Sequence, residues 1–184
     1  AISIDENKKA KIDNDKCISC GACVYKCPFG AITDKSYVLD IIDMLKGSEN
    51  NTKYKVYAVI APAIVSQCRF GRPSQVVTAI QKLGFHQVVE AALGADITLY
   101  NEALEWKEKG LMTTSCCPSY VAFIEKNFPE LVQHISHSVS PMIMTAQLIK
   151  HSDPTAKCVF IGPCASKKAE FKLPKTGGAI DCVM

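Results

Sequence analysis

The chain has 184 residues, of which 48% are hydrophobic and 21% charged, a composition typical of a globular protein with a hydrophobic core. Its net charge of +3 gives no argument for nucleic acid as a partner, and no apolar run approaches the ~18 residues that a membrane helix needs. No signal peptide begins the chain, so its ten cysteines indicate metal binding in a reducing cytoplasm rather than disulfides.

Residues 1–50 are predicted to form a small ferredoxin-like segment. A strand is expected around Ile12, followed by a cysteine-rich loop over 17–32. Apolar residues at helical spacing predict a helix that starts at 38 and stops at Gly47. Residues 48–52 have the composition of a linker, so we place a domain boundary there, with a second domain over 51–184.

The cysteine-rich loop carries the spacing that surrounds a 4Fe–4S cluster, with its cysteines at Cys17, Cys20, Cys23 and Cys27. Gaps of two residues let three thiolates bind three irons, whereas the cysteine before proline often serves a second cluster. A zinc site is the alternative, but zinc usually needs a second cysteine pair or a histidine pair. The spacing does not decide which residue is the fourth iron ligand. It is Cys68 or Cys182, or a cysteine of a second such motif upstream of Ala1, which we favour.

After residue 50, strands and helices alternate, which predicts an α/β domain with a parallel or mixed sheet flanked by helices. Strands are expected at 56–60, 87–89, 111–114 and 157–161. Helices are expected at 73–83, 95–109, 119–127 and 141–150. Ligands of such sheets lie beyond the carboxyl ends of the strands. We therefore expect three segments that follow predicted strands to converge, those of Pro62, Cys116–Cys117 and Cys164.

Two further cysteine motifs stand in the second domain, Thr114–Ser115–Cys116–Cys117–Pro118 and Pro163–Cys164–Ala165–Ser166–Lys167–Lys168. Free cysteine is commonly a small buried hydrophobic residue. Here, however, polar residues precede the first pair, and Pro118 begins a helix whose amides favour a thiolate. Lys167 follows Cys164 by three residues, which indicates recognition of an anionic cofactor. A surface position is its alternative.

These motifs resemble the first two active-site signatures of the iron–iron (FeFe) hydrogenases. Ala61–Pro62–Ala63, with Phe70–Gly71, is similar to the family's strand end near the diiron site. The four-cysteine loop is similar to the electron-relay domain of many members. The resemblance implies reversible reduction of protons to hydrogen, a ferredoxin or other redox protein as partner, and maturation proteins. It also implies an H-cluster, which joins a 4Fe–4S cube to a diiron unit with CO and cyanide.

The resemblance also implies roles for residues around the H-cluster. Cys117 and Cys164 would bind its cube, and Cys116 would stand at the open iron as proton donor and acceptor. Lys167 would hold a cyanide ligand. Two more residues would line the same pocket, Pro62 and Ala63.

A proton path is implied as well, running from Glu105 through Ser136 and Glu102 to Cys116. Glu102 and Glu105 stand three apart in a predicted helix and therefore share one face. An exposed acidic face is the alternative interpretation of that helix. Glu170 would be a buried salt-bridge partner.

The sequence departs from the family at several positions. Gly162 stands where catalytic members have methionine, Tyr120 replaces a tryptophan, and Ile64–Val65–Ser66 lacks the usual arginine. The third signature, which supplies two more ligands to the cube, does not precede Met184, so we expect a fragment with little activity alone. The alternative is a hydrogenase-like iron–sulfur assembly or sensory protein without hydrogenase activity. A plain ferredoxin would leave about 130 residues unexplained.

Overall fold

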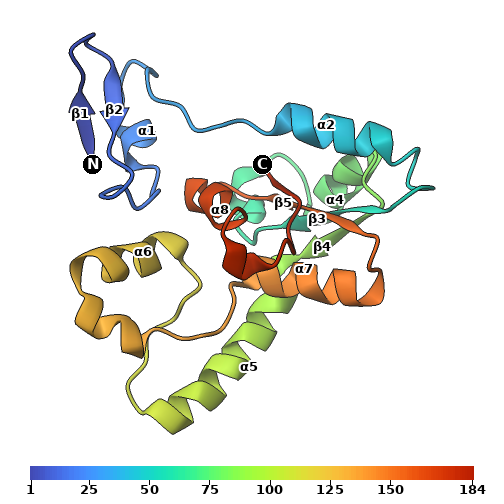
Figure 1. The fold of residues 1–184 in the computed structure, drawn as a ribbon. Coiled ribbons are helices and arrows are strands. Elements are labelled where there is room, and N and C mark those ends of the chain that lie inside the picture. The colour runs from blue at the N-terminus through green and yellow to red at the C-terminus, as the bar shows by residue number, and fades with distance from the viewer.

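The computed structural model describes all 184 residues and has a four-stranded sheet at its centre (Figure 1). Its strands are β3 (Val56–Ile60), β4 (Gln87–Glu90), β5 (Lys157–Ile161) and β6 (Cys182–Val183). They lie in the order β4-β3-β5-β6, and every neighbouring pair is parallel. The predicted α/β class is therefore confirmed. With only two residues, β6 is too short for a periodic pattern to reveal.

Helices cover both faces of the sheet (Figure 1). On one face lie α2 (Val38–Gly47) and α4 (Pro73–Lys82), and α7 (Pro141–Ser152) lies on the other. Along β3, Ala58 and Ile60 pack toward α2 and α4, whereas Val59 packs toward α7. Successive side chains of a strand point to opposite faces, so a sheet covered on both sides needs continuous apolar strands.

The long helix α5 (Ala91–Lys109) packs across α7. At Gly94 the two backbones approach closely, since a Cβ there would lie 2.8 Å from the Thr145 amide nitrogen. No larger residue fits this contact without moving α7. The contact fixes the direction in which α5 leaves the sheet, and so fixes the position of the acidic residues on its later turns. The helix begins four residues before the predicted start at 95.

The other elements surround one end of this core. Near the N-terminus β1 (Ile2–Ile4) pairs antiparallel with β2 (Ala10–Ile12), which is the strand predicted around Ile12. None of the helices has the length and apolarity that crossing a membrane requires. The remaining helices are short: α1 (Ala22–Lys26), α3 (Ile64–Gln67), α6 (Pro118–Asn127), α8 (Ala165–Glu170) and the 3-10 turns Pro129–His134 and Pro174–Thr176.

The predicted strand over 111–114 is wrong. This segment pairs with no strand of the sheet, and its one bridge joins Thr113 to Ile135. The Thr113 amide donates to the His134 carbonyl at 2.7 Å, and the Ser136 amide donates to the Thr113 carbonyl at 2.8 Å. Leu111 is 65% exposed, so the segment has no continuous apolar side to bury against a sheet. The motif at Cys116–Cys117 consequently belongs to the helical layer.

Candidate iron–sulfur site

The four-cysteine loop surrounds a cavity. Cys17, Cys20 and Cys23 all line one space of about 720 Å³. Ser19 and Gly21 turn the backbone between them, with left-handed φ angles of +57° and +76°. Glycine adopts this conformation freely, whereas other residues adopt it at a cost.

The fourth cysteine of the loop has a thiolate-stabilising surrounding. The backbone N–H groups of Phe29, Ala31 and Ile32 lower the pKa of Cys27 below its usual value. Amides that point at a sulfur favour its charged form, which is the form that binds iron.

The loop fits a 4Fe–4S cluster by this geometry. No three histidine, cysteine or acidic side chains converge on a point that a single ion could occupy. A cube is instead held at its corners, so its ligands must stand around a volume, as Cys17, Cys20 and Cys23 do. Neither candidate for the fourth ligand lines this cavity, because Cys182 is buried in the core and Cys68 lines another space.

The second cysteine group is assembled from two helix starts. Cys117 immediately precedes α6, and Cys164 immediately precedes α8. The two have nearly the same backbone conformation, with φ and ψ of −101° and 107° at Cys117 and −102° and 112° at Cys164. Two residues into each helix, the hydroxyls of Ser119 and Ser166 hydrogen-bond to each other. This bond between buried side chains holds the two cysteine-bearing turns side by side.

The four-cysteine loop contacts this second group directly. The Ser166 hydroxyl donates to the Ser19 carbonyl at 3.1 Å, so the Ser119 hydroxyl is the donor in the bond to Ser166. Gly21 lies against α8 so closely that a Cβ there would stand 3.0 Å from the Ala165 Cβ. In Figure 1, α8 lies beside both α6 and the segment of β1, β2 and α1. Residues about 145 apart in sequence therefore form one contact region.

Two lysines fasten the loop to the same region. Lys126 of α6 donates from Nζ to the Cys17 carbonyl at 2.8 Å, and Lys168 of α8 forms an ion pair with Asp34 at 2.6 Å. Hydrogen bonds from a charged donor are stronger than neutral ones. Each end of the loop is thus attached to one of the two cysteine-bearing helices.

Lys167 forms a buried ion pair beside the cysteines. Its Nζ lies 2.6 Å from Glu170 Oε2 and donates to the Cys116 carbonyl at 3.0 Å. The two side chains are only 13% and 5% exposed. An ammonium group has three N–H donors, and these two contacts use two of them.

Glu102 is connected to the Cys116 backbone through Thr114. The Thr114 hydroxyl donates to Glu102 Oε1 at 2.7 Å and accepts the Cys116 amide at 3.3 Å. The Ser115 amide also points at Glu102 Oε1, at 3.4 Å. Thr114 was not among the predicted site residues. Its position two residues before Cys116, in the same motif, could have identified it.

Glu105 accepts hydrogen bonds from several donors. Ser136 donates to its Oε2 at 2.6 Å, and Lys109 donates to its Oε1 at 2.6 Å. Burial alone would raise the pKa of Glu105, but hydrogen bonds from Lys109, Ser136 and His137 lower it to about 2. The carboxylate is therefore ionised at neutral pH. The sequence contained a signal for Lys109, which stands four residues after Glu105, but none for His137.

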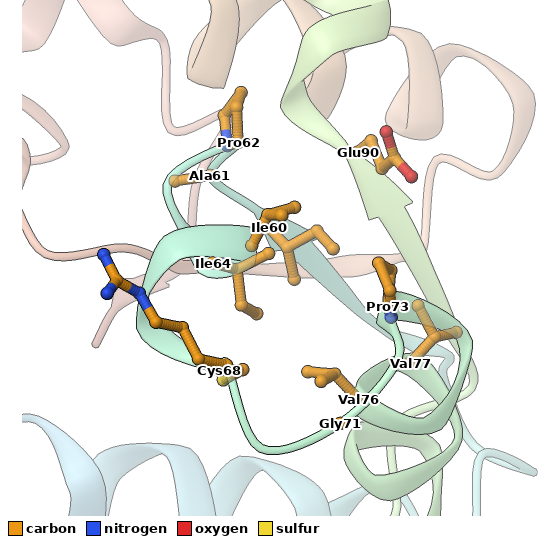
Figure 2. A pocket seen from close by; sticks show the side chains of 12 residues that line it. Ile60, Ala61, Pro62, Ile64, Cys68, Gly71, Pro73, Val76, Val77 and Glu90 are labelled. Atoms are coloured by element: carbon orange, nitrogen blue, oxygen red, sulfur yellow. The ribbon is translucent and has the colours of Figure 1, made fainter.

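The segment after β3 lines a separate cavity of about 290 Å³ (Figure 2). Ala61 and Pro62 belong to its wall, whereas Ala63 does not. Ile60, Ile64 and Val76 point toward its middle, with Cys68 at one side (Figure 2). None of the three cysteines Cys116, Cys117 and Cys164 lines this cavity. The segment after β5 does approach this wall, since a Cβ at Gly162 would lie 3.0 Å from the Ala61 Cβ.

The remaining cysteines belong to the core. Cys158 is fully buried in β5, and burial raises the pKa of its thiol to about 12. Cys182 of β6 is 2% exposed, and burial raises its pKa as well. Thiols that stay protonated are poor metal ligands.

Comparison with known families agrees with this arrangement. Residues 54–184 match the family described as "Iron only hydrogenase large subunit, C-terminal domain", and residues 10–33 match "4Fe-4S binding domain". The chain belongs to the iron-only hydrogenase large-subunit family. It is accordingly an FeFe-hydrogenase-like iron–sulfur protein, divergent from the members to which it is similar.

Individual relatives are of two kinds. The periplasmic Fe hydrogenase large subunit of Nitratidesulfovibrio vulgaris (strain Hildenborough) is 32% identical, over 90% of this chain and 52% of that protein. The cytosolic Fe-S cluster assembly factor NAR1 of Kluyveromyces lactis is 24% identical, over 100% of this chain and 42% of that protein. Among solved structures, a variant of apo FeFe hydrogenase HydA1 from Chlamydomonas reinhardtii matches with a TM-score of 0.69 and 25% identity, over 82% of this chain and 45% of that one. The chain thus spans about half the length of these proteins or less.

Proposed function

We propose that this chain is part of an enzyme that reversibly reduces protons to hydrogen with electrons from a ferredoxin or another redox protein. The observation that supports this most is the contact between the two cysteine groups through Ser19, Ser166 and Ser119. Electron transfer between clusters weakens steeply with distance, so a relay cluster is useful only when it lies against its acceptor. The four-cysteine loop lies against both cysteine-bearing helices.

An H-cluster fits the second group in part. Cys117 and Cys164 offer two thiolates from adjacent turns, whereas a cube takes four ligands. Because the relatives are about twice as long, we expect the other two from further residues of the complete protein. When bound, the H-cluster supplies the iron at which protons and electrons combine.

The chain's own residues would hold that group and move protons toward it. Lys167 is kept in place by Glu170 and the Cys116 carbonyl, which leaves one N–H to donate to a cyanide ligand. Cys116 would be the last proton carrier, with Glu102 connected to its backbone through Thr114. Farther out, Glu105 and Ser136 share a 2.6 Å hydrogen bond and would form the entrance.

A second function, iron–sulfur assembly or sensing without hydrogenase activity, is favoured by Gly162. A Cβ at this position would lie 2.7 Å from Phe160 Cε1 and 3.0 Å from the Ala61 Cβ, so the structure has no room for the family's methionine. The NAR1 relative also aligns over the whole chain. Against this alternative, a scaffold has no need of the two carboxylates Glu102, bonded to Thr114, and Glu105, bonded to Ser136.

The proposal also divides the chain into two domains, 1–50 and 51–184. These contain the two matched family ranges, 10–33 and 54–184. We also place the protein in the cytoplasm, because its ten free cysteines need a reducing compartment. Maturation proteins would be further partners, since an H-cluster has to be assembled and inserted.

The test is hydrogen turnover by the complete protein, matured without oxygen and assayed with reduced ferredoxin. We expect hydrogen evolution together with infrared bands of CO and cyanide. C117A should lose those bands but keep the relay cluster in electron paramagnetic resonance, whereas C116A should keep the bands and lose turnover. C68S is the matched control, since Cys68 lines a different cavity. A fully loaded 4Fe–4S protein with neither hydrogen turnover nor these bands would instead support the assembly function.

A further inference from the structure

His137 lies at the outer end of the proton path and contacts two charged groups. Its Nδ1 stands 2.8 Å from Glu105 Oε1 and 3.1 Å from Lys109 Nζ. Its backbone N–H donates to both oxygens of Glu105, at 3.1 Å each. The side chain is 83% exposed, whereas that of Glu105 is only 14% exposed. The ring therefore joins the solvent to a carboxylate that is mostly covered.

The surroundings of Nδ1 suit the ring in both of its charge states. A carboxylate can only accept a hydrogen bond, and an ammonium group can only donate one. When Nδ1 carries a proton, it donates to Glu105, and when Nδ1 is bare, it accepts from Lys109. The imidazole can thus gain or lose a proton without moving and without losing a partner.

We propose that His137 collects protons from water and delivers them to Glu105. The inference rests on the proposed hydrogenase function and adds the entry point of its proton path. In the loading step the exposed Nε2 binds a proton from hydronium, releasing water. In the delivery step the Nδ1–H bond breaks, an O–H bond forms at Glu105 Oε1, and the ring is left neutral with its proton on Nε2. Exchange with water, one proton lost at Nε2 and one gained at Nδ1, restores the first tautomer.

The charges around the ring support a role for His137 in collecting protons and for Glu105 in accepting them. Histidine is the side chain that ordinarily changes charge between pH 5 and 8, whereas the pKa of Glu105 is about 2. Near neutral pH Glu105 is therefore ionised and carries a proton only in transit. The other titratable groups near the ring are those that line a cavity with it or stand on the adjoining turn, namely Glu125, Glu170, Lys175 and His134.

The proposal is tested by H137Q in the complete, matured protein, with H151Q on the exposed last turn of α7 as the matched control. We expect H137Q to lower hydrogen evolution at least about tenfold above pH 7, where hydronium is scarce, and less at pH 5. Added imidazole should restore a large part of the loss, because a soluble ring can replace the missing one. Rescue separates proton delivery from a purely structural role, and circular dichroism verifies that the variant is folded.

A second measurement needs no cluster. In the metal-free protein, nuclear magnetic resonance should show that E105Q and K109M each change the chemical shift of the His137 Nδ1 nitrogen, because each removes one of its two partners. An Nδ1 shift that neither substitution changes would overturn the proposal, as would an H137Q enzyme as active as the wild type at every pH. A wild-type protein that turns over no hydrogen would overturn the proposed function, and the role of His137 with it. The two failures are therefore distinguishable.

Discussion

Replacing Glu105 by glutamine removes a negative charge that accepts hydrogen bonds from Lys109, Ser136 and His137. The substitution keeps the size of the side chain. The pKa of Glu105 falls from 4.5 to about 2 in the folded protein. At about 1.4 kcal/mol per pKa unit this shift corresponds to roughly 3 kcal/mol of stability. Lys109 and His137 are 28% and 83% exposed, so solvent screening reduces the contribution. We expect E105Q to destabilise the fold by about 1–2 kcal/mol at pH 7.

The same reasoning fixes the pH dependence. A carboxylate with a lowered pKa contributes stability that is complete above its unfolded value of about 4.5 and is lost as the pH falls through about 2. The difference between wild type and E105Q should therefore drop to less than half of its neutral value by about pH 3. Urea unfolding of the metal-free protein at pH 7, 5 and 3 measures it. E108Q, on an exposed position of the same helix, is the control and should change stability by less than about 0.5 kcal/mol. An E105Q protein as stable as the wild type at pH 7, or a difference that is constant down to pH 3, would refute the reasoning.

Three more substitutions test the packing of the site. G162M should destabilise by about 1–3 kcal/mol, because its side chain would overlap the buried Phe160 ring, and an unchanged thermal midpoint would contradict this. S166A should cost about 1 kcal/mol and speed amide hydrogen exchange in the four-cysteine loop, and equal exchange would show that the Ser19 contact does not hold the loop. E170A should cost about 3–5 kcal/mol in urea unfolding, because it leaves Lys167 buried without its carboxylate, whereas a loss below about 1 kcal/mol would mean that the pair is solvated.

Much of the fold could be predicted from local patterns. The strands 56–60 and 157–161 were found because both faces of the sheet are covered, which leaves a continuous apolar run in the sequence. Proline at the first turn marked the starts of α4, α6 and α7. The strand over 111–114 was wrong because a short run has the same composition whether it joins a sheet or makes one bridge, as Thr113 does with Ile135.

The candidate site divides in the same way. The order and spacing of Cys17–Cys27, Cys116–Cys117 and Cys164 identified two cysteine groups and the family, because the spacing of the cysteines is visible in the sequence. The contacts between these groups could not be predicted from the sequence. Ser166 meets Ser19 across 147 positions, and His137 meets Glu105 across 32. Such pairs are selected by how α5, α6 and α8 pack, which no local pattern encodes.

The sequence by itself thus determined the order and spacing of the cysteines and the family to which the chain belongs. Only the tertiary structure decided that the four-cysteine loop lies against the second cysteine group, that Lys167 is buried with Glu170, and that Gly162 faces Phe160 with no room for a side chain. The reason is physical. Ligand chemistry belongs to residue types and their spacing, whereas burial, pKa and contact distance arise only when remote segments share one packed interior.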